Sequence, residues 1–350
     1  MTRRLSLLCA CAATCLALAP ASDTVSFHPA DGSSAAKKCA IHSEFSLGDV
    51  SAVVDGQDVS ENLPPDLEFA IEVLMEVTDD YVRSGAGRPL ELIRSYDELS
   101  LEWSAEGGGE SQSESADEFA ELEGRRVRFR WNDDEKEYDV SFHESEGDPE
   151  LLEGLGVDMD LLALLPEDEV SEGDRWSVEA RELGSVFFFG SDPGKLRPDV
   201  QGEGAEVFQQ IEAELLPQLE KLGEDFKTEC EYKGRREVDG RSLGVIRLAL
   251  KGDGSMDLAS LIAAAIEKQP MPEEVDVSIS AATLGLRVEG EGELLWDLEA
   301  GHLHAFEMTA DIEIDLEFDI DATAPDGDHS AEVSAELLGE ATWKVDLAGA

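Results

Sequence analysis

The sequence predicts an α+β fold dominated by long, twisted antiparallel strands, forming a curved sheet or half-barrel with two or three packed helices. Apolar and polar residues alternate with a period of two through several segments, most clearly 67–78 and 311–321. Turn-forming pairs such as Asp55-Gly56 and Asp239-Gly240 separate such segments. A third observation is that apolar residues within 204–228 follow helical spacing instead.

The first 21 residues have the three parts of a secretory signal peptide: a basic start, an apolar run and an A-x-A-like site at 19–21. We therefore expect an exported protein that is periplasmic, extracellular or located at the cell surface. The apolar run of this signal peptide is too short for a transmembrane segment. Every later apolar stretch of the chain is interrupted by carboxylates. A lipid anchor on Cys15 or Cys11 is less favoured, because the residues before Cys15 fit poorly and the run before Cys11 is too short.

The chain is very acidic, with 80 Asp and Glu against 27 Lys and Arg and a formal net charge of −53. The excess runs along all 350 residues rather than forming a tail. Such a charge repels nucleic acid and anionic membrane surfaces, so both are excluded as partners. A saline habitat or bound divalent cations would each account for the composition.

Cleavage after residue 21 would leave two of the five cysteines, Cys39 and Cys230. An even pair in an exported protein predicts a disulfide between them. The alternative is two separate buried thiols.

After the signal peptide we expect a loose leader at 22–44 and a β-rich N-terminal half at 45–182. The alternation at 67–78 favours a strand, with a helix as the alternative. The segment 105–118 is expected to be a flexible loop. Asp148-Pro149 predicts the start of a short helix. The other predicted strands of this half are 46–54, 90–103, a hairpin over 127–142, and a segment around Trp176.

The C-terminal half, 183–350, is expected to begin with a long loop. An amphipathic helix follows at about 204–228 and a second helix at 256–268, before Pro270. The predicted strands are 230–238 and 245–250, followed by an antiparallel meander of 275–280, 284–296, 302–320 and 331–347.

Three short motif groups stand out: Asp79-Asp80-Tyr81-Val82 with Gly87-Arg88-Pro89, Leu165-Pro166 with Gly173-Asp174-Arg175-Trp176, and Gly290 to Trp296 before Gly301. Together they resemble a group of uncharacterised exported β-rich proteins of planctomycetes and myxobacteria. The resemblance implies a β-rich second half and supplies no activity for this chain.

The segment 311–321 places six carboxylates on one face of a strand and apolar groups on the other. Same-face neighbours are about 7 Å apart, whereas Ca²⁺ ligands lie about 2.3–2.6 Å from the ion. A neighbouring strand would have to supply further ligands, so a solvated face is the favoured interpretation. Weakly bound Ca²⁺ is the alternative, and no other cofactor is predicted. The apolar face should pack on a core or line a cavity.

His302 and His304, with Glu307 nearby, are weak candidates for a zinc or iron site, since two imidazoles bind a metal only when further ligands converge. A polar pair at a hairpin exit is the favoured interpretation. Nucleophile, phosphate-loop and dinucleotide motifs are missing, so no catalytic or cofactor-binding residue is predicted.

These observations favour a non-enzymatic binding or carrier protein, with an apolar small molecule in a groove of the curved sheet and the segment 204–228 capping it. The alternative is a cell-surface structural or interaction protein, with an envelope protein as partner and an acidic surface screened by cations. A metal enzyme or hydrolase around His302 and His304 ranks third.

Overall fold

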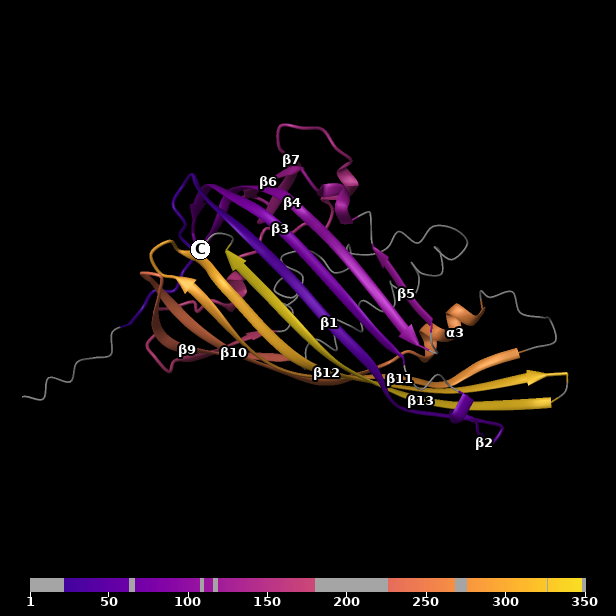
Figure 1. The fold of residues 1–350 in the computed structure, drawn as a ribbon. Helices are drawn as coiled ribbons and strands as arrows, with labels where there is room; N and C mark the ends of the chain where they lie inside the picture. The colour runs from indigo at the N-terminus through magenta and orange to yellow at the C-terminus, as the bar shows by residue number, and fades with distance from the viewer. Residues whose placement is uncertain are drawn as a thin grey trace, which may run out of the picture.

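A computed structural model shows one antiparallel sheet of 13 strands in the order β7-β6-β4-β3-β1-β13-β12-β11-β10-β9-β8, with β2 beside β1 and β5 beside β4 (Figure 1). It describes residues 22–62, 67–107, 110–115, 119–179, 226–267, 276–325 and 327–347. The strands are β1 Ser33–Val54, β2 Gln57–Asp58, β3 Glu68–Gly85, β4 Arg88–Gly107, β5 Glu110–Ser115, β6 Arg126–Asn132, β7 Glu137–Phe142, β8 Arg175–Glu179, β9 Lys227–Val238, β10 Arg241–Asp257, β11 Asp276–Asp297, β12 His302–Ala324 and β13 Gly327–Leu347.

The β-dominated fold is confirmed, and the strands are longer than the usual 3–10 residues. The strand predicted at 67–78, the hairpin over 127–142 and the final meander are present. The segments 275–280 and 284–296 join into one strand, β11, because a register shift between Ile279 and Ala281 keeps the ladder running. Part of the expected loop at 105–118 pairs with β4 as β5.

The helical content differs from the expectation. Within the described ranges the α-helix is α3 (Ala259–Glu267), which packs against β11 and matches the helix predicted at 256–268. Asp148 begins a helix as predicted, but a 3₁₀ one, η3 (Pro149–Leu152), with the Asp148 carboxylate accepting the backbone N–H of Glu150. The other 3₁₀ helices are η1 (Ser60–Asn62), η2 (Phe119–Leu122) and η4 (Leu162–Leu164). The helix predicted at 204–228 lies outside the described residues up to 225, and Lys227 and Thr228 belong to β9.

The expected loose leader at 22–44 is wrong, because Val25 and Phe27 are buried in the core and a strand begins at Ser33. Residues 33–44 are the first half of β1, which pairs with β3 on one side and with β13 on the other. The small residues of 33–44 suggested a linker, but Ala35 and Cys39 are buried on one face of β1. Because β1 pairs with β13, strands from both expected halves form one continuous sheet. The signal peptide at 1–21 and the boundary at 183 lie outside the described residues.

We call the face that carries the buried core the inner face and the opposite one the outer face. At one end of the sheet, residues 22–31 and 143–174 lie on the inner face and close a packed core. Val25, Phe27, Met159, Leu161 and Leu164 are at most 3% exposed there. Trp296 is fully buried and donates its indole N–H to the carbonyl of Ser26, as expected of a core anchor. We call this the packed end; it is the end of β9 and β10 in Figure 1.

Candidate functional site

The inner face of β12 is apolar from Phe306 onward. Every second residue from Phe306 to Ala322 points inward and none is polar. The register continues this face across neighbouring strands, because Ile312 pairs with Val288 on β11 and with Gly339 on β13, and Gly339 pairs with Phe45 on β1. The predicted two-faced character of this strand is therefore confirmed.

Packing divides this inner face into two parts. At the packed end Phe306, Met308 and Ala310 are at most 3% exposed and belong to the core. Beyond Ala310 the inward side chains are only half-buried or more exposed. We call these residues the distal apolar face: Ile312, Ile314, Leu316, Phe318 and Ile320 of β12, Leu284 and Leu286 of β11, Val333 and Leu337 of β13, Phe45 and Leu47 of β1, Phe69 and Ile71 of β3, and Trp103 of β4.

An aromatic pair lies near the middle of this face. Phe45 and Phe69 are cross-strand partners whose rings stack with centroids 4.8 Å apart. Phe45 also covers Gly339, where an added Cβ would collide with the Phe45 ring. Beside this pair, Ile71 and Trp103 are each 37% exposed, which is high for large apolar side chains pointing to an inner face.

The charged residues on the inner face of β1 and β3, Lys37 and Asp79, are confined to the packed end. Lys37 Nζ lies 2.9 Å from carboxylate oxygens of both Asp79 and Asp160, and all three side chains are at most 4% exposed. Arg94 holds Asp79 with two hydrogen bonds of 2.7 and 3.0 Å. Burial alone would raise the pKa of Asp79, but Arg94 and Lys37 outweigh it and lower the pKa.

This buried network fastens the covering segment to the sheet. Arg94 donates to the carbonyls of Gly156 and Val157, and Tyr81 donates its hydroxyl to Asp160 at 2.7 Å. The backbone N–H of Leu303 donates to the other Asp160 oxygen. We did not predict the network. Its signal was present, since Lys37 and Asp79 stand at apolar-phase positions of alternating strands.

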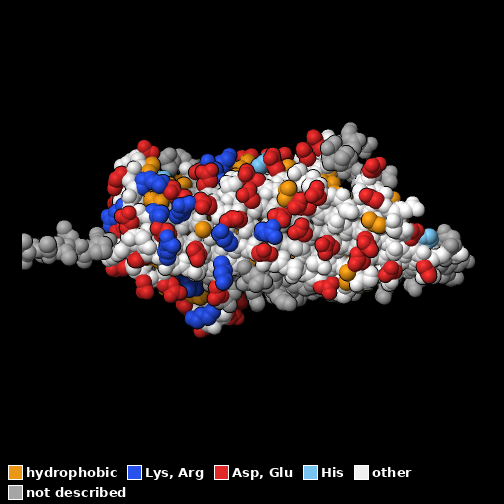
Figure 2. All heavy atoms as spheres, turned by 90° about the horizontal axis from the view of Figure 1, so that it is seen from below, with side chains coloured by type: hydrophobic (Ala, Val, Ile, Leu, Met, Phe, Trp, Pro, Cys, Tyr) orange, Lys and Arg blue, Asp and Glu red, His pale blue; other side chains and the backbone are white. Residues whose placement is uncertain are grey.

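The outer face is acidic. The carboxylates of 311–321 point to it, and three of them stand directly opposite carboxylates of β13, in the pairs Asp311–Glu340, Asp315–Glu336 and Asp319–Glu332. Figure 2 shows Lys and Arg gathered toward the packed end of this face, whereas Asp and Glu are spread over its whole length. The two faces of the sheet therefore offer opposite chemistry.

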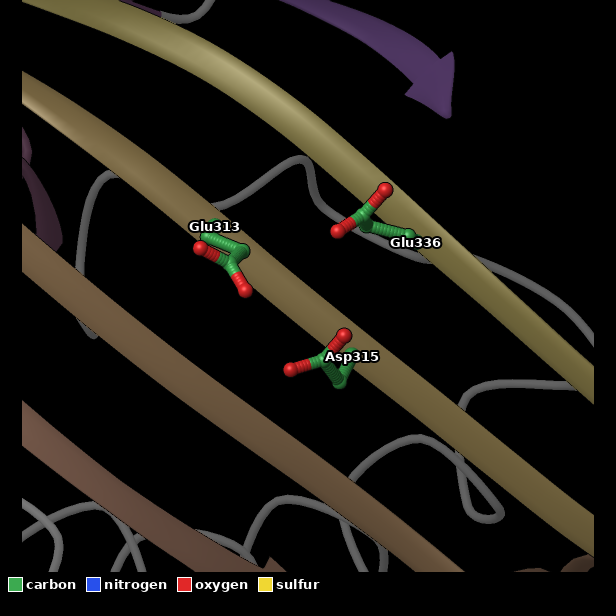
Figure 3. Close-up of side chains that lie close together, drawn as sticks. All are labelled: Glu313, Asp315 and Glu336. Atoms are coloured by element: carbon green, nitrogen blue, oxygen red, sulfur yellow. The ribbon is translucent and has the colours of Figure 1, made fainter. Parts of the chain in front are cut away.

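Glu313, Asp315 and Glu336 come closest to a cation site on this outer face (Figure 3). One carboxylate oxygen from each lies within 4.8 Å of the others. The neighbouring strand thus supplies the help that Ca²⁺ binding was expected to require. Arg287 competes for the cluster, because it already contacts Glu313 at 2.7 Å.

Shallow depressions also lie on the outer face. One of about 520 Å³ has a mixed lining, in which the carboxylates of Glu44, Asp311 and Glu340 lie beside Ala70 and Leu338. One of about 480 Å³ is lined by Asp253, Arg287 and Asp315 around Gly285.

The structure does not bring the predicted metal candidates together. His302 contacts the carbonyl of Leu303 through Nδ1, and His304 is the extra residue at a register shift of β12 against β11. Burial, with Arg241 nearby, lowers the pKa of His304. Among the described residues, the one group of three metal-ligating side chains is the carboxylate cluster above, which includes neither histidine nor Glu307.

Cys39 and Cys230 are free thiols, so the predicted disulfide is not formed and the alternative of two buried thiols holds. Cys39 lies on β1 and Cys230 on β9, and four strands separate these two in the sheet. Burial raises the pKa of each thiol to about 12. Both cysteines act as small apolar core residues.

Comparisons with known proteins do not identify the chain. No family model and no curated protein matches it. Among solved structures, an outer membrane channel from Pseudomonas putida F1 aligns over 92% of this chain and 97% of that chain, with 8% identity and a TM-score of 0.14. A mutant of Rh. blastica porin aligns over 86% and 99%, with 8% identity and a TM-score of 0.15. Such scores carry no argument about fold or function. Within the described residues, no helix is long and apolar enough to cross a membrane.

Proposed function

We propose that this chain is an exported, non-enzymatic binding or carrier protein that holds an apolar ligand against the distal apolar face. One observation carries the proposal: the inner face stays apolar beyond the packed core, where its large side chains are only half-buried. Removing apolar surface from water contributes about 25 cal/mol per Å². A ligand that covers this face would therefore be bound mainly by the hydrophobic effect.

The shape of the face supports an elongated ligand. From Ile312 to Ile320 the strand advances eight residues, about 26 Å at roughly 3.3 Å per residue. Apolar residues of four neighbouring strands flank this line.

The first test is native mass spectrometry of the protein purified without detergent from its own export route. The proposal expects extra mass from a co-purified apolar molecule. Binding is then measured with N-phenyl-1-naphthylamine, an uncharged apolar probe whose fluorescence rises on binding. If the wild type carries no adduct and does not bind the probe, the proposal is wrong.

A matched pair of variants locates the binding face. Leu316→Asn changes the inner face, and Glu317→Asn changes the adjacent outward residue of the same strand. Leu316→Asn should weaken probe binding several-fold while Glu317→Asn leaves it unchanged. Equal effects of the two substitutions would place the probe elsewhere.

The alternative function, a cell-surface structural or interaction protein with a cation-screened acidic surface, is favoured by the outer face. Directly opposed carboxylates repel one another, and a divalent cation would relieve this. If the alternative holds, Ca²⁺ should raise Tm more than NaCl of equal ionic strength does. A Tm that responds to ionic strength alone would count against it.

A further inference from the structure

We propose that the ligand of the distal apolar face is uncharged along its length, a neutral lipid or hydrocarbon rather than a fatty-acid anion or a phospholipid. This inference rests on the proposed function and adds the chemical class of the ligand. It follows from where the chain places its charges relative to that face.

The distal apolar face offers no cation to an anionic head group. Recognition of carboxylate or phosphate normally uses Arg or Lys. Among the described inner-face positions of β1, β3 and β10 to β13 beyond the packed end, none is Lys or Arg. An anion buried there would lose its hydration without a compensating partner.

The cations of the inner face are already committed at the packed end. Lys37 is held by Asp79 and Asp160, and Arg94 by Asp79 and two backbone carbonyls. Lys38, Arg287 and Lys251 lie on the outer face, each in contact with a glutamate of a neighbouring strand. A ligand head group could recruit one of these side chains only by breaking an existing ion pair.

The electrostatic field of the surrounding carboxylates also disfavours an anionic ligand. The formal net charge is −53, and the outer face over the same strands carries directly opposed carboxylates. The Debye length is about 8–10 Å at physiological ionic strength, so carboxylates one strand away still repel an approaching anion. A neutral molecule of the same length meets no such penalty.

The test compares 1-decanol with decanoate, which share one chain and differ in head-group charge at pH 8. Each displaces N-phenyl-1-naphthylamine from the full chain, at 20 mM and 500 mM NaCl. We expect decanol to bind about tenfold or more tightly at low salt, and decanoate to gain affinity as salt screens the repulsion. Equal or tighter binding of decanoate at low salt would overturn the inference and leave the proposed function standing. If neither the probe nor decanol binds, the proposed function itself fails.

Two variants with the same change in net charge separate a missing cation from the general field. Leu316→Lys places an ammonium on the inner face, and Glu317→Gln removes one charge from the outer face of the same strand. Leu316→Lys should shift the decanoate-to-decanol affinity ratio about tenfold toward decanoate, and Glu317→Gln far less. Leu337→Lys on β13 serves as a second inner-face variant if Leu316→Lys does not fold. Equal shifts in inner-face and outer-face variants would contradict the argument.

Discussion

Lys37 on β1 and Asp79 on β3 form an ion pair of 2.9 Å in which both side chains are at most 1% exposed. Asp160 of the covering segment lies equally close to the same ammonium group. One lysine thus ties two central strands to the segment that closes the packed core. Lys37, Asp79, Arg94 and Asp160 are all buried in this network, in contrast to the exposed carboxylates of the outer face.

Removing one partner of this network should be strongly destabilising. Lys37→Met leaves Asp79 and Asp160 without their shared ammonium group, and breaking a buried pair costs about 3–5 kcal/mol. Urea unfolding measures the loss. The matched control is Lys38→Met, one residue along β1, whose ion pair with Glu76 is solvent-exposed and should matter little. Similar midpoints for the two variants would show that the buried network contributes no more than a surface pair.

The Asp158 carboxylate should make the protein less stable as pH rises. Burial, together with the nearby Asp160, raises its pKa to about 6, above the unfolded value near 3.9. The stability that this group contributes is therefore present at low pH and lost as pH rises through 6. Between pH 5 and 7 the loss should be about 1 kcal/mol.

The Asp158→Asn variant tests this pH dependence. It should flatten the change in unfolding free energy between pH 5 and 7, whereas Asp148→Asn should not. Asp148 is a suitable control because it also accepts a backbone N–H at the start of a 3₁₀ helix, but is exposed. Parallel pH curves for the wild type and Asp158→Asn would contradict the assignment.

Gly339 leaves the room that Phe45 occupies. In Gly339→Ala the new methyl group would collide with the Phe45 ring and lie 2.7 Å from the carbonyl oxygen of Glu44, so the backbone must shift. We expect a loss of about 1–3 kcal/mol in thermal or urea unfolding. In Gly285→Ala the nearest atom is Asp315 Cβ at 3.3 Å, and this control should be near neutral. Equal losses of unfolding free energy in Gly339→Ala and Gly285→Ala would mean that the stack of Phe45 on Phe69 is not rigid.

Asp315 stands directly opposite Glu336, and like charges in that relation are destabilising. Asp315→Asn should therefore raise Tm by about 1–2 °C at low salt. The gain should be smaller at high salt, because salt already screens the repulsion between Asp315 and Glu336 in the wild type. Asp321→Asn is the control, because Asp321 faces Ser330. A gain of equal size in both variants would point to net charge rather than to the opposed pair.

The local pattern of the sequence determined much of this protein. Alternation located β3, β12 and β13 and identified which residues of 312–320 are apolar, because side chains of a strand alternate between two faces. Asp148-Pro149 marked a helix start, and a helix begins there. These features depend on neighbouring residues only, so the sequence carries them directly.

Long-range pairing decided the rest. Residues 33–44 are a central strand rather than a leader because they pair with β13, which lies about 300 residues further along the chain. The approach of Glu336 to Asp315, the confinement of Lys37 beside Asp160 and the separation of Cys39 from Cys230 all follow from strand order. Strand order minimises the free energy of the whole sheet, and no local pattern encodes which strands become neighbours.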